Sequence, residues 1–344
     1  MSYLELPIPN RSEHLWRYTP WSKVHPTQVD VMPEINSANV YFNGDLVDAK
    51  TNGAEISKTD ISRAFLVESN SYIHNITIDD SNANSEIKVI SDGEMNSCNL
   101  HFEVKNSGSI RVRLSGESKW FGISITGNLH GNVNLSFAIV NDLSENTTIL
   151  RCEDWDIARD STLEYGELSI GGGRIKSDIR TYLKGTNSTL MQNIAVNCRD
   201  SRIDDHHIEI HHLSGHSNSS LTVKSACADK GHAIGTGLLI IEENCDKSDA
   251  GQVFKNLLLS EKARAEAIPE LEVLSDDVSA AHGAASSSVD PEQIHYMMSR
   301  GFSRDDAQTE IVEGFLISSF AKTKNDYAKE FLIEALSTNQ NEWE

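Results

Sequence analysis

Residues 256–301 decide the fold, and they read NLLLSEKARAEAIPELEVLSDDVSAAHGAASSSVDPEQIHYMMSRG. Within them, residues 269–273 (PELEV) alternate apolar and charged side chains, as a strand does when one of its faces is buried. Further on, Asp290 precedes Pro291, which is the usual order of an N-cap and a first helical residue. The stretch therefore predicts that a body of strands ends, and a helical segment begins, near residue 289.

Upstream of this stretch, from about residue 36 to 273, the sequence is a series of short segments in which every second residue is apolar. Residues 110–114 (IRVRL) and 133–139 (VNLSFAI) are clear cases. Turn residues such as Gly171 separate the segments, and we find no stretch with the helical period in this region. The pattern fits a sandwich, a barrel or a solenoid of stacked strands, and the lack of a strict repeat leaves that choice open.

Downstream of residue 289 the apolar residues change to helical spacing. Ser303 repeats the capping pattern of Asp290, and Ala307, Ile311 and Phe315 then follow at intervals of four. The sequence therefore predicts a small C-terminal helical domain.

The composition restricts the partners of the chain. Its 344 residues include 30 basic and 51 acidic side chains, which gives a net charge of −21. Such a surface repels phosphate backbones and anionic lipid, so we expect neither nucleic-acid nor membrane binding. No apolar run is long enough to cross a bilayer, and the N-terminus lacks a basic stretch followed by an apolar core. We therefore expect a cytoplasmic protein.

Two common kinds of site are missing from the sequence. The five cysteines are widely spread and form no CxxC, so we expect neither a disulfide framework nor a self-contained zinc or cluster site. Residues 171–174 (GGGR) lack the lysine and hydroxyl of a phosphate-binding loop. We therefore expect this chain to bind no nucleotide.

Several motifs, in order and spacing, resemble the C-terminal signature of the SufB/SufD family of iron–sulfur cluster assembly proteins. They are NLLLSEKAR (256–264), PELEV (269–273), DDV (276–278), HGA (282–284), DPEQ (290–293), Tyr296 and SRG (299–301). A weaker likeness includes His211, His212, Ser220, Lys224, Gly237, Gln252 and WRYTP (16–20). The resemblance implies a mainly β fold: a right-handed parallel β-helix over residues 35–288, between an N-terminal arm (1–34) and a C-terminal helical domain (289–344).

The resemblance also implies a function, which is that of a scaffold subunit and not of an enzyme. The chain would pair with a SufB-type homologue, or with a second copy of itself, and its helical domain would dock a SufC-type ATPase. Tyr296, Arg300, Phe302 and Glu313 are then the candidate contacts with the ATPase; each has ordinary helix packing as its alternative.

His282 is the first candidate ligand. The resemblance implies that the histidine of the HGA motif takes part in cluster assembly at the interface of the paired subunits, where a transient iron–sulfur cluster would form. A lone histidine is otherwise a structural residue. Counting back from Pro269, Phe254 stands where the paralogue has a cysteine, and a second nearby position holds Ala263. The chain therefore resembles the SufD-type member, which lacks that cysteine.

A second candidate metal site follows from the residues alone. If residues 206–212 form a strand, then His207, Glu209 and His211 share one face, and two imidazoles with a carboxylate suit iron or zinc. The alternative is a polar face in which the histidines pair with acids.

Two paired carboxylates, Asp204-Asp205 and Asp276-Asp277, are expected in turns or caps. Adjacent strand residues point to opposite faces, so neither pair forms the two-carboxylate centre of a glycosidase. A carbohydrate-active β-helix enzyme and a purely structural solenoid remain the alternative functions.

Overall fold

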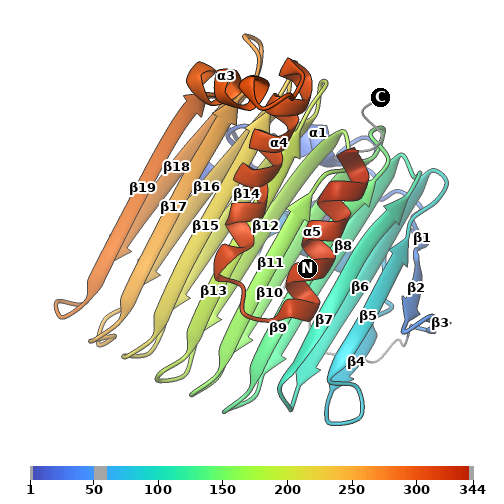
Figure 1. Cartoon of the computed structure of the whole chain (residues 1–344). Coiled ribbons are helices and arrows are strands. Elements are labelled where there is room, and N and C mark those ends of the chain that lie inside the picture. The colour runs from blue at the N-terminus through green and yellow to red at the C-terminus, as the bar shows by residue number, and fades with distance from the viewer. Residues whose placement is uncertain (1–2, 50–59, 341–344) are drawn as a thin grey trace.

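The alternating segments form a solenoid in which each coil adds one strand to each of two facing sheets (Figure 1). The computed structural model describes residues 3–49 and 60–340. All strand pairings are parallel except those that β2 makes with β3 and β5. The prediction of a mainly β, parallel β-solenoid with a small C-terminal helical part is confirmed.

One sheet holds the first strand of each coil. It contains β1 (Asn36–Ser37), β4 (His74–Ile78), β6 (Met95–Val104), β8 (Trp120–Leu129), β10 (Thr148–Ile157), β12 (Arg174–Leu183), β14 (Ile203–His212), β16 (His232–Ile241) and β18 (Arg264–Val273). We call it the first sheet. The second sheet contains β2 (Asn39–Phe42), β3 (Asp45–Leu46), β5 (Asn84–Ile90), β7 (Gly108–Gly116), β9 (Asn134–Leu143), β11 (Thr162–Ser169), β13 (Thr189–Cys198), β15 (Asn218–Cys227), β17 (Asp249–Leu258) and β19 (Ser279–Ser288).

Strand β10 shows how the alternation is used. Ile149, Trp155 and Ile157 point between the sheets into the main core, whereas Leu150 and Cys152 point outward, into a cluster under the N-terminal segment. Coil length varies, however: Thr148 pairs with Arg174, 26 residues on, and His232 with Arg264, 32 residues on. This variation is why the sequence shows no strict repeat.

Helices cover the outer faces of both sheets. The described helices are η1 (Tyr3–Glu5), η2 (His14–Trp16), α1 (Trp21–Val24), α2 (Ile61–Ser69), α3 (Pro291–Ser299), α4 (Arg304–Ile317), η3 (Ser318–Lys322) and α5 (Asp326–Gln340). Helix α3 differs from the others in lying beyond the ends of the last strands (Figure 1). Helices α4 and α5 lie across the second sheet (Figure 1), where Leu332 and Leu316 pack on Ala138 and Ala195. The N-terminal segment and α2 cover the first sheet. Within 3–49 and 60–340, no helix is both long and apolar enough to span a membrane.

Helix α2 corrects the expectation that residues 36–273 contain no helix. Asp60 caps it by accepting hydrogen bonds from the backbone N–H groups of Ser62 and Arg63. Phe65 and Leu66 are then buried in the cluster beneath the N-terminal segment. At nine residues the helix is too short for its periodicity to stand out against the surrounding strands.

The predicted caps of the C-terminal helices are confirmed. Asp290 accepts a hydrogen bond from the backbone N–H of Glu292, with Pro291 as the first residue of α3. Gly301 ends that segment with a φ of +101°, a conformation that glycine adopts without strain. Ser303 caps α4 by accepting from the N–H of Asp306.

The solenoid stays open at its C-terminal end. Strands β18 and β19 are the last strands of the two sheets, and among residues 3–49 and 60–340 each pairs with one neighbour only. They lie at one margin of Figure 1, beyond the part of the body that α4 and α5 cover. Most side chains of β18 are half-buried and most of those of β19 are exposed, unlike the buried strands of the middle coils. We refer to β18 and β19 as the open end.

Candidate functional site

His282 lies on β19, at the open end. Its register partner is Gln252 of β17, which is buried with its side chain in the interior. Directly paired residues of parallel strands point to the same face of a sheet, so His282 also points to the interior face of its coil. No described strand covers this coil, and His282 is therefore exposed.

Small residues surround His282. Ala280, Ala281 and Ala284 flank it along β19, and a Cβ atom added at Gly283 would meet nothing within 4 Å. The exposed imidazole thus lies on a strand whose flanks leave room for another chain to approach.

Phe254 fills the interior of the preceding coil, on β17. Its side chain is 1% exposed, and Cβ atoms added at Gly235 or Gly237 would each lie 2.8 Å from its ring. The two glycines therefore make room for the ring. A phenyl ring has no donor atom for a metal, so this position contributes packing.

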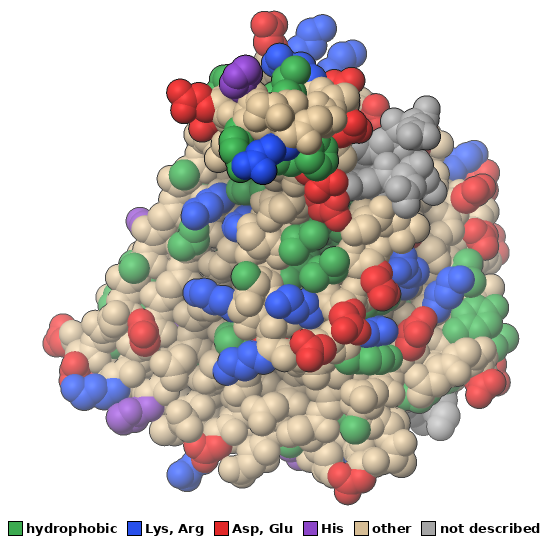
Figure 2. Space-filling view, viewed as in Figure 1, with side chains coloured by type: hydrophobic (Ala, Val, Ile, Leu, Met, Phe, Trp, Pro, Cys, Tyr) green, Lys and Arg blue, Asp and Glu red, His purple; other side chains and the backbone are tan. Residues whose placement is uncertain are grey.

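The structure brings three of the four candidate partner contacts together. Tyr296 and Phe302 are exposed to 57% and 39% on and just after α3. The Arg300 guanidinium lies 5.1 Å above the Tyr296 ring and donates to its hydroxyl at 3.0 Å. Apolar and basic side chains are visible around α3 in Figure 2. Glu313 is apart from this group: it lies on α4 and accepts a hydrogen bond from Ser337 of α5 at 2.7 Å.

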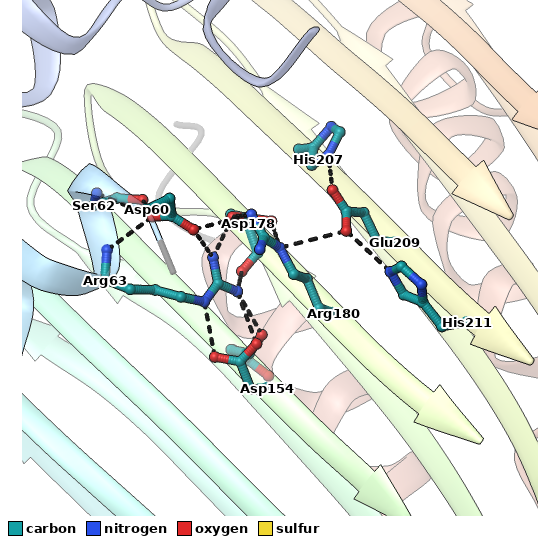
Figure 3. Close-up of polar contacts among 10 residues, drawn as sticks. Asp60, Ser62, Arg63, Asp154, Asp178, Arg180, His207, Glu209 and His211 are labelled. Carbon is teal, nitrogen blue, oxygen red and sulfur yellow. Dashed lines mark hydrogen bonds and ion pairs between the residues drawn. The ribbon is translucent and has the colours of Figure 1, made fainter. Parts of the chain in front are cut away.

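His207, Glu209 and His211 share the outer face of β14, as predicted (Figure 3). Nε2 of His207 lies 3.0 Å from Oε1 of Glu209, and Nε2 of His211 lies 3.1 Å from Oε2. The His211 ring stacks on Tyr182, with centroids 4.9 Å apart. Burial acts to raise the pKa of Glu209, but the hydrogen bonds from both histidines and the charge of Arg180 lower it well below its ordinary value.

Sequence reasoning missed the ion-pair cluster beside these residues (Figure 3). Arg63 of α2 is fully buried and contacts Asp178 of β12, the oxygens of Asp154 at 2.8 and 3.1 Å, and Asp60 at 2.9 Å. Arg180 contacts Asp178 at 2.7 Å. The only sequence signal for this cluster was the pair of opposite charges in DIR (178–180). That pair does not reveal that Arg63, 115 residues before Asp178, also contacts Asp178.

A second ionic group, also missed, lies inside the solenoid. Arg151 donates to Glu153 and to Glu167, each at 2.6 Å, and the Trp155 indole donates to Glu153 at 2.7 Å. These side chains are at most 2% exposed and lie on the interior face, where the alternation predicts apolar residues. Each charge is retained there because it has a partner.

The interior ionic group continues into β14. Arg202 contacts Asp204, and Nε2 of His206 lies 2.7 Å from Oδ1 of Asp204. Nδ1 of His206 lies 4.0 Å from Glu167. Burial acts to lower the pKa of His206, but the carboxylates of Asp204 and Glu167 outweigh it and raise that pKa. Arg151 and Arg202 supply two cations for the three carboxylates of Glu153, Glu167 and Asp204.

The expectation of a turn or cap for Asp204-Asp205 was wrong. Both residues belong to β14, where Asp204 faces the interior while Asp205 faces outward and accepts from Lys176 at 2.9 Å. Asp204 pairs with Arg202 on the interior face, and Asp205 pairs with Lys176 on the outer face. These ion pairs stabilise two adjacent aspartates within a strand, although the residue type by itself favours a turn. Asp277, in contrast, lies in an exposed bend and pairs with Lys247.

Comparisons with known proteins agree with this architecture. The family model described as "SUF system FeS cluster assembly, SufBD core domain" matches residues 114–315. The chain is 32% identical over 195 residues to the iron–sulfur cluster assembly protein SufD of Escherichia coli, which covers 57% of this chain and 45% of the relative. It is 31% identical over 193 residues to SufD of Bacillus subtilis, covering 56% and 44%. A SufBD family protein of Mycobacterium tuberculosis is 26% identical over 211 residues, covering 57% and 52%. The matched region is thus about half the length of these relatives.

Proposed function

We propose that this chain, which belongs to the SufB/SufD family of iron–sulfur cluster assembly proteins, is a scaffold subunit of a SUF-type assembly complex. It pairs through its open end with a SufB-type homologue, or with a second copy of itself. The observation that carries this proposal is the open end: two unpaired strand edges, small side chains and an exposed imidazole on the interior face of the last coil. Edges of this kind are templates for pairing with another chain.

In this proposal the iron–sulfur cluster is cargo. The neutral imidazole of His282 supplies a nitrogen ligand, and the partner supplies the thiolates. Phe254 cannot replace the partner's cysteine, so this chain alone does not complete the site. No catalytic step is assigned to its own residues.

The ATPase of the complex docks on the surface formed by Tyr296, Arg300 and Phe302. Exposed aromatic residues beside an arginine are the typical anchors of protein interfaces. Closure of two ATPase subunits on ATP hydrolysis would pull on the helical domains and shift the paired solenoids, so that ligands near His282 become reachable. Arg300→Glu is expected to abolish capture of a SufC-type ATPase in a pull-down, whereas Arg11→Glu, an exposed arginine of the N-terminal segment, leaves it intact. Equal capture by the two variants would disprove this docking surface.

Anaerobic reconstitution with iron and sulfide tests the pairing. Visible absorbance of an iron–sulfur cluster is expected only when this chain is mixed with its cysteine-bearing homologue and the ATPase, and it should fall with His282→Ala. The matched control is His216→Asn, an exposed histidine in a turn with a φ of +59°, which asparagine tolerates. If the absorbance is indifferent to His282→Ala, the chain contributes architecture and no ligand.

A further inference from the structure

The outer face of the first sheet holds a group of side chains that the proposed function does not use. Asp178, His207 and Glu209 each offer one ligand atom, and these atoms all lie within 4.8 Å of one another. Asp178 and His207 are register partners on β12 and β14, and Glu209 is two residues along the same face. We propose that these three side chains bind one divalent transition-metal ion of the zinc or ferrous class.

The distances suit ligands of a single ion. Two ligand atoms that are each about 2.1 Å from an ion lie about 3 Å apart when they occupy adjacent corners of its coordination sphere. Nε2 of His207 lies 3.0 Å from Oε1 of Glu209, which fits two adjacent ligands of one ion. His211 contacts the other oxygen of Glu209 and so lies outside the ligand set. Asp178 completes the group, because its ligand atom lies within 4.8 Å of those of both His207 and Glu209; all three residues are labelled in Figure 3.

His207 provides an independent observation. The residue is 3% exposed, and its Nδ1 is a buried atom without a hydrogen-bond partner among residues 3–49 and 60–340. An imidazole this deeply buried normally uses both ring nitrogens, because an unpaired polar atom costs free energy. The described side chains therefore leave this imidazole only half satisfied: Nε2 has Glu209 as a neighbour, and Nδ1 has no partner.

The charges of the cluster favour a divalent cation. The carboxylates outnumber the guanidiniums among the contacting residues Asp60, Arg63, Asp154, Asp178, Arg180 and Glu209. Four carboxylates and two guanidiniums leave two negative charges uncompensated in a largely buried setting. An ion of charge +2 removes that excess. Arg63 and Arg180 then orient Asp178 from outside, as outer hydrogen bonds commonly orient metal-binding carboxylates.

Imidazole and carboxylate ligands together select the ion. Hard ions such as Mg²⁺ prefer oxygen ligands only, whereas Zn²⁺ and Fe²⁺ accept one or two imidazoles with carboxylates. The site lies on β12 and β14, two strands away from β18 in the first sheet, and Arg63 ties it to α2. The ion is therefore separate from the cluster cargo proposed at His282, and its binding does not depend on that proposal.

Isothermal titration calorimetry tests the site on the full, tag-free chain after dialysis against a chelator. Zn²⁺ is the probe, and we expect one equivalent to bind well above any background from the other histidines. His207→Gln and Glu209→Gln should each weaken this binding at least tenfold. The matched control is His130→Gln, because His130 contacts Glu103 on the same sheet without a buried aspartate beside it; it should change the affinity less than twofold.

A second measurement keeps the test decisive if a buried variant folds poorly. One equivalent of Zn²⁺ should raise the melting temperature of the wild-type chain. This rise should shrink in His211→Gln, because the half-buried His211 is not itself a ligand but holds Oε2 of Glu209 from outside the ligand set. Circular dichroism reports whether each variant keeps its strands. Binding that is absent, or equally tight in wild type, His207→Gln and Glu209→Gln, would overturn the proposal.

Discussion

The middle coils and the open end are built from the same kind of parallel strand, yet their interiors differ. Between β10 and β15, each coil is covered by the next, and even Arg151 and Glu167 are at most 2% exposed. At β18 and β19 the strand pattern continues, but no further coil follows in the described part of the chain, and the side chains of β19 are mostly small. The difference teaches that stacking, and not strand sequence, decides whether an inward-facing residue is core or surface.

The two regions should therefore respond differently to the loss of a polar side chain. In the middle coils a charge persists only because its partner is beside it, so removing one partner leaves the other buried and unpaired. At the open end water already reaches the interior face. The following predictions test this contrast, beginning with the largest expected effect.

Arg151→Met should destabilise the chain by roughly 3–5 kcal/mol, because it leaves the carboxylates of Glu153 and Glu167 buried without their cation. Urea unfolding followed by circular dichroism measures the loss. The control is Arg113→Met, since Arg113 forms a half-exposed pair with Asp142 at 3.1 Å, and exposed pairs contribute about 1 kcal/mol or less. A cost below about 1 kcal/mol for Arg151→Met would mean that water reaches the interior ionic group.

A smaller effect is expected from His212, whose ring nitrogens each lie 2.7 Å from a serine hydroxyl inside the solenoid. Burial lowers its pKa to about 4. The unfolded chain, with an ordinary histidine pKa near ~6.5, then binds the extra proton first as the pH falls. Stability should therefore drop by up to about 3 kcal/mol between pH ~6.5 and ~4 on account of this residue.

The variant His212→Gln should make the acid side of the stability profile shallower. His206→Gln is the comparison, because the raised pKa of His206 has the opposite sign: its contribution is full below pH ~6.5 and is lost as the pH rises through its folded pKa. It should leave the acid slope unchanged. Parallel profiles for His212→Gln and wild type would contradict the burial of a neutral imidazole.

Much of the fold could be predicted because it depends on local chemistry. The period-two alternation predicted the strands, and Asp290, Pro291 and Ser303 predicted where the C-terminal helices begin. Helix α2 escaped because its one clear signal, the cap at Asp60, is followed by only nine helical residues. The choice of a solenoid over a sandwich came from the family resemblance, since coils of 26 and 32 residues conceal the repeat.

The site was predictable where its residues adjoin in sequence. His207, Glu209 and His211 share a strand face, as the alternation requires, and their mutual contacts follow from that. Asp178 and Arg63 could not be found in this way, because stacking of coils and docking of α2 bring them in from distant positions. The interior ionic group was missed for a related reason: alternation assigns a residue to the interior but does not say which charge it meets there.

The smallest expected effect on stability is at the open end. His282→Ala should change the free energy of unfolding by no more than about 0.5 kcal/mol, because an exposed side chain without buried neighbours contributes little to folding. The same substitution is expected to lower cluster absorbance in the reconstituted mixture, so stability and function separate at this residue. The control is Gln252→Ala at its buried register partner, which should be clearly destabilising. A cost of more than about 1 kcal/mol for His282→Ala would contradict this prediction. It would mean that a second copy of the chain covers the open end, and the unfolding midpoint should then depend on protein concentration.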